Sequence, residues 1–187
     1  MTPNGLHLYA AAASGNDVSH FTIDSAGNLI FAGCIGGSSG CTPLVALDGA
    51  ASVTVTPNGR NLYAAAEAAN DVSHFTIDNA GNLIFAGCIG SLSGCTPVGS
   101  LQSADGLAVT PNGLHLYAAA AGAGAVSHFT IDSAGNLIFA GCIGVLSGCT
   151  PTNPSLALGD AEGLAVTPDG LNLYAAALAV SHLTIAP

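Results

Sequence analysis

Residues 109–120 read Val-Thr-Pro-Asn-Gly-Leu-His-Leu-Tyr-Ala-Ala-Ala, and close copies of this stretch recur along the chain. The Thr-Pro-Asn-Gly core starts at Thr2, Thr56 and Thr110 and returns as Thr-Pro-Asp-Gly at Thr167, with spacings of 54, 54 and 57 residues. Residues 2–43 and 56–97 differ at only eight positions. The chain is therefore a repeat protein. We expect a single repeat domain, residues 1–187, with units 2–55, 56–109 and 110–166 and a partial unit 167–187.

Each repeat contains four short strand-like segments, and one complete set is 106–110, 115–120, 126–132 and 137–143. These segments carry β-branched and aromatic residues without a long 3.6-residue periodicity. The first two are joined by a tight hairpin, because Asn-Gly tolerates the positive φ angles that such a turn requires. The turn-forming residues of these hairpins are Asn4, Gly5, Asn58, Gly59, Asn112, Gly113, Asp169 and Gly170.

Apolar residues occur on both faces of the expected strands, so both faces should be covered. Repeated sets of four antiparallel strands that are covered on both sides are typical of β-propeller blades. A β-solenoid is the competing architecture, but its coils usually need fewer residues and lack paired hairpin turns. The sequence predicts an all-β propeller with about 3.5–4 blades in this chain of 187 residues.

The repeat also resembles a known family. Val-Thr-Pro-Asn-Gly-Leu-His-Leu-Tyr-Ala-Ala-Ala, then Asn-Asp-Val-Ser-His-Phe-Thr-Ile-Asp and Ala-Gly-Asn-Leu, are similar to the repeat of bacterial lactonase-like (YVTN-type) β-propellers. The resemblance covers essentially the whole chain and implies the propeller fold. It implies no single function, because that repeat serves surface proteins, binding proteins and lactonases alike.

The phase of the repeats suggests blades that are not all complete. Met1 holds the position of Val55 and Val109, so the strand tally is three, four, four and three. Open blade faces and unpaired strand edges tend to drive association. We therefore expect self-association, either as a two-fold ring of about eight blades or as a head-to-tail filament. A truncated piece of a longer propeller is the remaining interpretation.

Composition excludes several function classes. The chain has one basic residue, Arg60, against eleven acidic ones, with a net charge of −10. Nucleic-acid binding and binding to an anionic membrane both need clustered basic residues, so neither is expected. No apolar run approaches the roughly 20 residues of a membrane span.

The six cysteines form three pairs with identical spacing: Cys34 and Cys41, Cys88 and Cys95, Cys142 and Cys149. This spacing favours local disulfides that close the long connection after the last strand of each unit. A metal site would need clustered ligands at shorter spacing, so none is expected, and free thiols are the minor alternative. Disulfides imply an extracellular, cell-surface or periplasmic location.

A histidine recurs in the third strand of each unit, at His20, His74, His128 and His182. Blade-equivalent residues are spread around the ring axis, so we interpret these as half-buried histidines that form hydrogen bonds within or between blades rather than as zinc ligands. His7 and His115 align with Asn61 and Asn172, which suggests a polar, exposed role.

Asp24, Asp78 and Asp132 end the third strand, ahead of Ser-Ala-Gly-Asn or Asn-Ala-Gly-Asn, where a carboxylate accepts turn N–H groups. Calcium is the alternative, but the loop offers few oxygen ligands. Asp17 and Asp71 fit an exposed turn between the second and third strands.

Catalytic motifs are weak, and no catalytic residue, metal or cofactor is expected. Ser19 and His20 point to opposite faces of a strand, and a sugar-phosphate lactonase would need basic residues to hold its substrate. The first hypothesis is an extracellular structural protein, not an enzyme, that assembles with itself through open blade faces and strand edges. The alternative is a propeller that binds a glycan or a protein, and a lactonase-like hydrolase ranks third.

Overall fold

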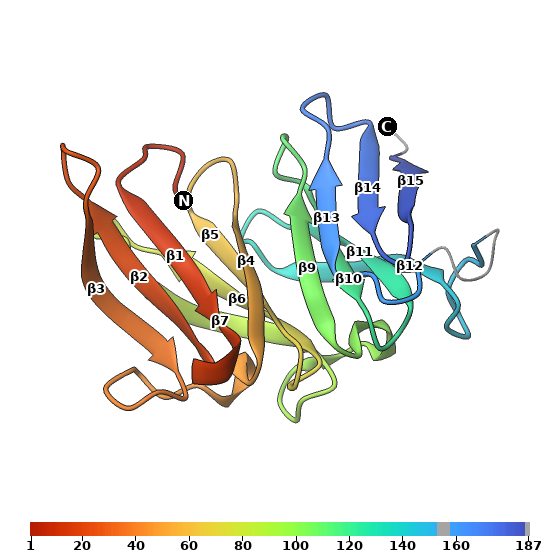
Figure 1. Ribbon diagram of the computed structural model, residues 1–187, viewed down its shortest axis with the longest axis horizontal. Helices are drawn as coiled ribbons and strands as arrows, with labels where there is room; N and C mark the ends of the chain where they lie inside the picture. The colour runs from red at the N-terminus through yellow and green to blue at the C-terminus, as the bar shows by residue number, and fades with distance from the viewer. Residues whose placement is uncertain (153–157, 186–187) are drawn as a thin grey trace.

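The computed structural model describes residues 1–152 and 158–185, whose regular structure is four sheets, antiparallel except for one short parallel pair, and three short 3-10 helices (Figure 1). Blade 1 contains β1 (His7–Ala12), β2 (Asp17–Ile23) and β3 (Leu29–Gly36). Blade 2 contains β4 (Ala50–Val55), β5 (Asn61–Ala66), β6 (Asp71–Ile77), β7 (Leu83–Gly90) and the short β8 (Thr96–Pro97). Blade 3 contains β9 (Ala104–Val109), β10 (His115–Ala120), β11 (Ala125–Ile131) and β12 (Leu137–Gly144). Blade 4 contains β13 (Gly163–Val166), β14 (Asn172–Ala176) and β15 (Val180–Thr184).

The predicted fold class is confirmed, and the strand tally matches except for β8. This two-residue strand pairs in parallel with β7, at Ile89 and Thr96, and belongs to the connection that the sequence places after the last strand. The 3-10 helices η1 (Ala13–Gly15), η2 (Val45–Leu47) and η3 (Gly99–Leu101) occupy other connections. No helix in the part of the chain that the structure describes is long and apolar enough to cross a membrane.

The hairpin turns form because their side chains satisfy the backbone locally. In the turn at 56–61, the Thr56 hydroxyl donates to Asn58 Oδ1 at 2.7 Å and accepts the Asn61 N–H at 3.1 Å. Asn58 Oδ1 also accepts the Arg60 N–H at 2.9 Å. Gly59 has a φ of +71°, in the left-handed region that favours glycine. The same contacts recur at the other hairpins, so the local sequence alone specifies this turn.

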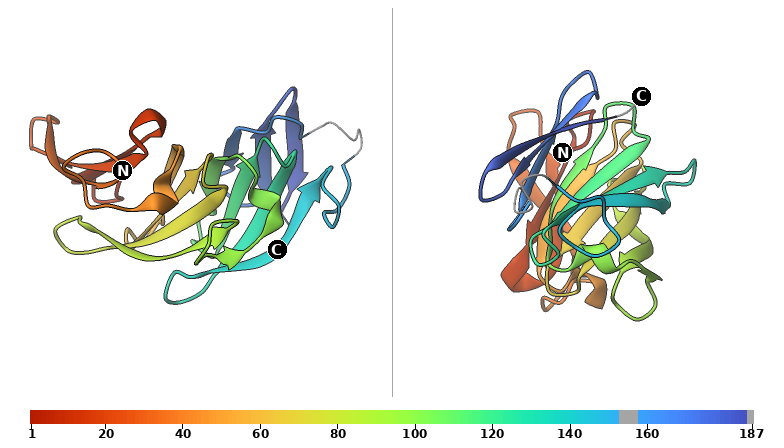
Figure 2. Two further views of the ribbon diagram at one scale, coloured as in Figure 1. Left: turned by 90° about the horizontal axis from the view of Figure 1, so that it is seen from below. Right: turned by 90° about the vertical axis from the view of Figure 1, so that its right-hand side faces the viewer.

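The sheets of neighbouring blades lie face to face (Figure 2). Three apolar layers fill the spaces between them. Tyr9, Val18, Leu62 and Phe75 lie in the layer between blades 1 and 2, and the equivalent residues of later blades form the next two layers. All six residues of β5 are buried, since blade 2 is covered on both sides. The left view of Figure 2 shows the four sheets following an arc, and the described residues do not close it into a ring.

The innermost strands of neighbouring blades, β4, β9 and β13, lie side by side. Gly106 in β9 shows how close they come: a Cβ built there would lie 2.2 Å from the Glu162 carbonyl oxygen, at the entry to β13. Glycine is therefore required at this point for blades 3 and 4 to converge.

Candidate functional sites

Each blade has two ends, which carry different chemistry. The turn end holds the Thr-Pro-Asn-Gly hairpins and the Asp-x-Ala-Gly-Asn turns between the third and outermost strands. The disulfide end holds the cysteine loops and the first residues of the innermost strands. We describe the disulfide end first.

The three cysteine pairs are disulfides, Cys34–Cys41, Cys88–Cys95 and Cys142–Cys149, with Cα atoms 4.7 Å apart in each. Each closes the loop that leaves the outermost strand. Because the closed loops are short, the chain-entropy model gives each bond about 2–3 kcal/mol, mainly by restricting the unfolded chain.

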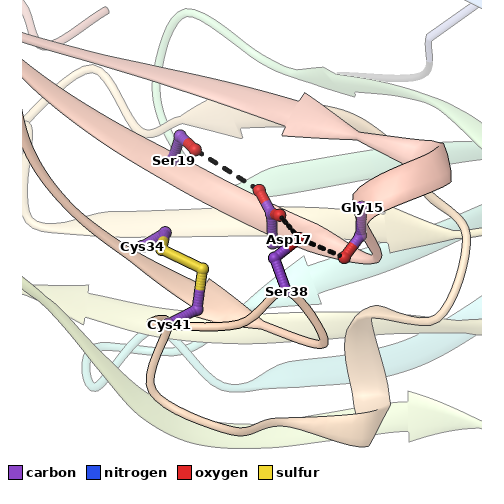
Figure 3. Close-up of a disulfide and its surroundings, with 6 residues drawn as sticks. All are labelled: Gly15, Asp17, Ser19, Cys34, Ser38 and Cys41. Atoms are coloured by element: carbon purple, nitrogen blue, oxygen red, sulfur yellow. Dashed lines mark hydrogen bonds between the residues drawn. A yellow bond between two sulfur atoms is a disulfide. The ribbon is translucent and has the colours of Figure 1, made fainter.

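Beside the first disulfide lies Asp17, the first residue of β2 (Figure 3). Its Oδ2 accepts a 2.6 Å hydrogen bond from Ser38 Oγ, and its Oδ1 accepts one of 3.3 Å from Ser19 Oγ. Ser38 Oγ also lies 2.9 Å from the Gly15 carbonyl oxygen. Asp17 is buried, so the prediction of an exposed turn residue is wrong for it. The carboxylate can be buried because both of its oxygens accept hydrogen bonds.

Asp71, at the equivalent position in blade 2, has lost those partners. Leu92 replaces Ser38, and Ser73 donates instead to the Ala46 carbonyl at 3.2 Å. Asp71 is fully buried, its Oδ1 has no hydrogen-bond partner, and its Oδ2 lies 3.7 Å from Cys95 Sγ. Burial raises the pKa of Asp71 to about 7. The exposed-turn prediction is wrong here too, because the loop after β7 covers the carboxyl group.

Asp71, Cys88 and Cys95 are the one group of three potential metal ligands found within residues 1–152 and 158–185. The two sulfurs are bonded to each other, and a metal ligand must be a thiolate. In its disulfide form this group is therefore not a metal site.

At the turn end, each third-strand histidine bonds a side chain of the second strand. His20 Nε2 lies 3.0 Å from His7 Nδ1, and His74 Nε2 lies 2.9 Å from Asn61 Oδ1. Because Asn61 Oδ1 can only accept, His74 carries its proton on Nε2. Burial is the main cause that lowers the pKa of His20, with the neighbouring His7 second. His7 is half-buried, so its predicted exposed role is wrong: histidine and asparagine interchange because both offer an acceptor to the buried ring.

The turn of the following blade lies against His20 in blade 1 and against His74 in blade 2. Tyr9 stacks on His20 with ring centroids 5.0 Å apart, and its hydroxyl donates to the Gly81 carbonyl at 2.7 Å. Tyr63 donates in the same way to the Gly135 carbonyl at 2.8 Å. The repeated tyrosine and histidine therefore join consecutive blades, and Asp78 and Asp132 hold the turns that they contact.

Those aspartates bind their own turns. Asp78 Oδ1 accepts the N–H groups of Ala80 and Asn82, both at 2.8 Å, and Oδ2 accepts from Asn82 Nδ2 at 3.0 Å. These hydrogen bonds lower the pKa of Asp78, the Asn82 side chain contributing most. Asp24 and Asp132 are held alike, so the carboxylates act as turn acceptors.

The carboxyl group of Asp105, which sequence reasoning missed, also lies at the disulfide end, on an innermost strand. Asp105 is the second residue of β9, and it interacts electrostatically with Glu67 of blade 2 and Glu162 of blade 4. Burial, then Glu67, then Glu162 raise the pKa of Asp105 to about 6, against a weaker opposing hydrogen bond from Ala121. Aligning the units could have found it, because Ala51, Asp105 and Glu162 occupy one column at the start of successive innermost strands.

Comparison with solved structures identifies the architecture. A protein from Bacteroides uniformis, provisionally named as a 6-phosphogluconolactonase, superposes with a TM-score of 0.69 at 21% identity, over 95% of this chain and 46% of that one. The fold is that of a lactonase-like β-propeller. A periplasmic gluconolactonase from Pseudomonas aeruginosa matches with a TM-score of 0.62 at 19% identity, over 93% of this chain and 44% of that one. A functionally unknown protein from Desulfotomaculum acetoxidans matches with a TM-score of 0.69 at 22% identity, over 98% of this chain and 52% of that one.

The chain thus spans about half the length of the lactonase-like propellers that it matches. Neither the models of known families nor the curated proteins give a match.

These neighbours overturn the first functional hypothesis. The prediction of a structural, self-assembling protein that is not an enzyme is wrong, since two of the similar structures are provisionally named as 6-phosphogluconolactonases and one is named as a gluconolactonase. The error has a physical source: the scarcity of basic residues counts against a sugar-phosphate substrate, and it is no argument against a lactone that carries no charge.

Proposed function

We propose that this chain is the catalytic part of a hydrolase that opens uncharged lactones, with Asp105 as the general base. The observation that carries the proposal is the place of Asp105, a half-buried carboxyl group on the middle one of three side-by-side innermost strands in a fold similar to that of named lactonases. Burial and the neighbouring Glu67 and Glu162 also raise its pKa to about 6. A group with a pKa near neutrality can both accept and return a proton at the working pH.

The position of Asp105 suits such a role. It lies on the middle one of three side-by-side innermost strands, so groups from blades 2 and 4 reach the same region. Glu67 and Glu162 are exposed, and both raise the proton affinity of Asp105 through electrostatic repulsion. A carboxyl group whose pKa is raised by burial and by like-charged neighbours is typical of a general acid or base.

The reaction balances with water alone. Asp105 accepts a proton from a water molecule as the water oxygen bonds to the lactone carbonyl carbon. The ring C–O bond then breaks, and Asp105 returns the proton to the departing alkoxide oxygen. The product is a hydroxy acid, which ionises at neutral pH.

Charge selects the substrate class. The chain carries a net charge of −10 with Arg60 as its only lysine or arginine, and the region around Asp105 is acidic. Such a field repels a phosphorylated lactone but leaves the binding of a neutral one unaffected. It also favours release of the anionic product. An unphosphorylated sugar lactone is therefore the substrate class that we propose.

The proposal also includes a repeat type and a location. The repeated Tyr, the Asn-Asp-Val-Ser-His-Phe stretch and the Ala-Gly-Asn turns support a YVTN-type repeat. The three disulfides suit a periplasmic or extracellular protein, and the gluconolactonase from Pseudomonas aeruginosa is periplasmic by name.

The test is hydrolysis of glucono-δ-lactone in a pH-stat, corrected for spontaneous opening. We expect kcat/KM to rise with pH through about 6 as Asp105 ionises, and Asp105→Asn to lower it about 100-fold. Asp48→Asn is the matched control, because it removes an exposed carboxylate two residues before β4. Equal rates for the Asp105→Asn variant and the parent, or no turnover above background by the parent, would reject the proposal.

A further inference from the structure

The second disulfide of the chain lies beside a buried carboxyl group. The carboxyl group of Asp71 and the sulfurs of Cys88 and Cys95 all lie within 4.8 Å of one another, and Asp71 Oδ2 is 3.7 Å from Cys95 Sγ. A disulfide sulfur carries no hydrogen, so a hydrogen bond between these two atoms requires a protonated carboxyl group as the donor. Burial favours that form, since it raises the pKa of Asp71 to about 7.

The other two disulfides have different neighbours at the same position. In blade 1, Asp17 already accepts hydrogen bonds from Ser38 at 2.6 Å and from Ser19 at 3.3 Å (Figure 3). In blade 3 the position holds Ala125, which lies in an apolar cluster that Cys149 packs against. Of the three disulfides, the one in blade 2 is therefore the one with a carboxyl group placed to exchange a proton with sulfur.

The elements around Asp71 bring no competing partner. The strands β5 and β7 and the helix η2 pack against β6, on which Asp71 lies. Glu67 follows β5 and Asp48 follows η2, but both are exposed and neither contributes to the pKa shift of Asp71. The ionisable residue of β7 is Cys88 itself. Within the described part of the chain, Cys95 is thus the side chain within hydrogen-bond reach of Asp71.

The disulfide is more accessible to solvent than the carboxyl group. Cys88 and Cys95 are both half-buried, and Ser93 and Gly94 in the loop between them are exposed. Asp71 is fully buried. A small thiol can therefore approach the disulfide at the loop, while bulk water does not contact the carboxyl group.

We propose that Cys88–Cys95 is a site of thiol–disulfide exchange with small dithiols, in which Asp71 is the proton donor to Cys95. A thiolate of the dithiol attacks Cys88 Sγ, and the S–S bond breaks toward Cys95, because the sulfur that receives a proton is the better leaving group. The products are a mixed disulfide at Cys88, the Cys95 thiol and the Asp71 carboxylate. The thiol then donates to Oδ2, so the contact is kept with donor and acceptor exchanged.

A second exchange completes the reaction. The other thiolate of the dithiol attacks its own sulfur in the mixed disulfide and releases Cys88, which takes a proton from water. The dithiol leaves as a cyclic disulfide. The chain gains two electrons and the dithiol loses two, so no further oxidant or reductant is needed. Neither step uses Asp105, so the site does not rest on the lactonase proposal.

The reaction predicts an unusual dependence on pH. Below about 7 Asp71 holds the proton that Cys95 needs, and above it the carboxylate repels both the attacking and the departing thiolate. The rate constant per thiolate should therefore fall as pH rises. Loss of stability acts in the opposite direction, because a pKa raised by folding makes the folded state less stable at higher pH and exposes the disulfides more. A fall thus cannot come from unfolding.

The experiment reduces the oxidised chain with dithiothreitol from roughly pH 5.5 to 8.5 and divides each initial rate by the thiolate concentration. Alkylation followed by mass spectrometry reports the three disulfides in one sample. We expect the normalised rate at Cys88–Cys95 to fall about fivefold or more, while the other two disulfides stay constant within about twofold. The same pH profile at all three disulfides would overturn the inference.

A substitution in the loop tests the carboxyl group without removing it. Leu92→Ser places a hydroxyl where Ser38 stands in blade 1, so it should engage Asp71 and flatten the pH profile of the second disulfide. Leu146→Ser makes the same change in blade 3 and should leave that profile as it is in the parent. A fall that survives Leu92→Ser, or that disappears in both variants, would count against Asp71 as the donor.

Removing the acid gives an independent test. Asp71→Asn keeps the size of the side chain but has no proton to transfer, so the second disulfide should react at the same normalised rate across the pH range. Its rate at the acidic end should drop below that of the parent. An unchanged fall in this variant would show that the proton does not come from Asp71 and would reject the site.

Discussion

Ser38 Oγ lies 2.6 Å from Asp17 Oδ2, and the second unit has lost this contact while keeping the carboxyl group. The third unit has lost both members, with Ala125 and Leu146 packing in one apolar cluster. At this one site the first unit thus contains a hydrogen-bonded serine and aspartate, the second an aspartate that has lost its serine, and the third two apolar residues. A buried polar group without its partner is the costly member of such a series.

We therefore expect Leu92→Ser to restore the partner of Asp71. At pH 8 the new hydroxyl should donate to the ionised carboxylate and raise the free energy of unfolding by about 1–3 kcal/mol relative to the control. The control is Leu146→Ser, which makes the same substitution opposite Ala125, a residue that has no carboxylate. Urea unfolding followed by circular dichroism measures both. A loss as large as that of the control would mean that Asp71 is not short of a donor.

The pH dependence of stability should reveal the same carboxyl group. The pKa of Asp71 is raised to about 7 in the folded chain against 3.8 as its ordinary value, so the folded state holds a proton that the unfolded state releases. Stability is then lost as pH rises between these values, and the full cost, roughly 2–4 kcal/mol, is present above pH 7. Asp71→Asn should abolish that part of the dependence. Parallel stability curves for the parent and the variant from pH 4 to 8 would contradict this.

His7 should be replaceable by asparagine, because the second unit already makes that substitution. Asn61 accepts from His74 at 2.9 Å where His7 pairs with His20 at 3.0 Å. We expect His7→Asn to change the melting temperature by less than about 2 °C. His7→Leu, in contrast, leaves the buried His20 without its partner and should cost about 1–2 kcal/mol. Thermal unfolding of the two variants separates the hydrogen bond from simple packing.

The turns and strands could be predicted because they are local. Gly59 and Gly81 set their turns with positive φ angles, and Asp78 satisfies the N–H groups of its own loop. The pairing of cysteines seven residues apart is equally local. These features need no knowledge of how the blades are placed.

The candidate site could not be predicted in the same way. The chemistry of Asp105 depends on Glu67 and Glu162, which lie on different blades and meet only after the sheets stack. The burial of His7 depends on the turn around Gly81 of the next blade. Side chains brought together across blades leave no spacing signal along the chain, and a repeat alignment reveals only where one copy departs from the others.

Gly106 links stability to the proposed site. A Cβ at this position would lie 2.2 Å from the Glu162 carbonyl oxygen, so Gly106→Ala must push β13 away from β9. We expect a loss of about 2–4 kcal/mol in the free energy of unfolding. Gly99→Ala is the control, because a Cβ there meets nothing within 4 Å. Since Asp105 precedes Gly106, the variant should also weaken the influence of Glu162 and move the lower limb of the lactonase pH profile toward lower pH. Chemical unfolding and the pH-rate profile measure the two effects separately, and a destabilised variant with an unchanged profile would place Asp105 outside the reaction.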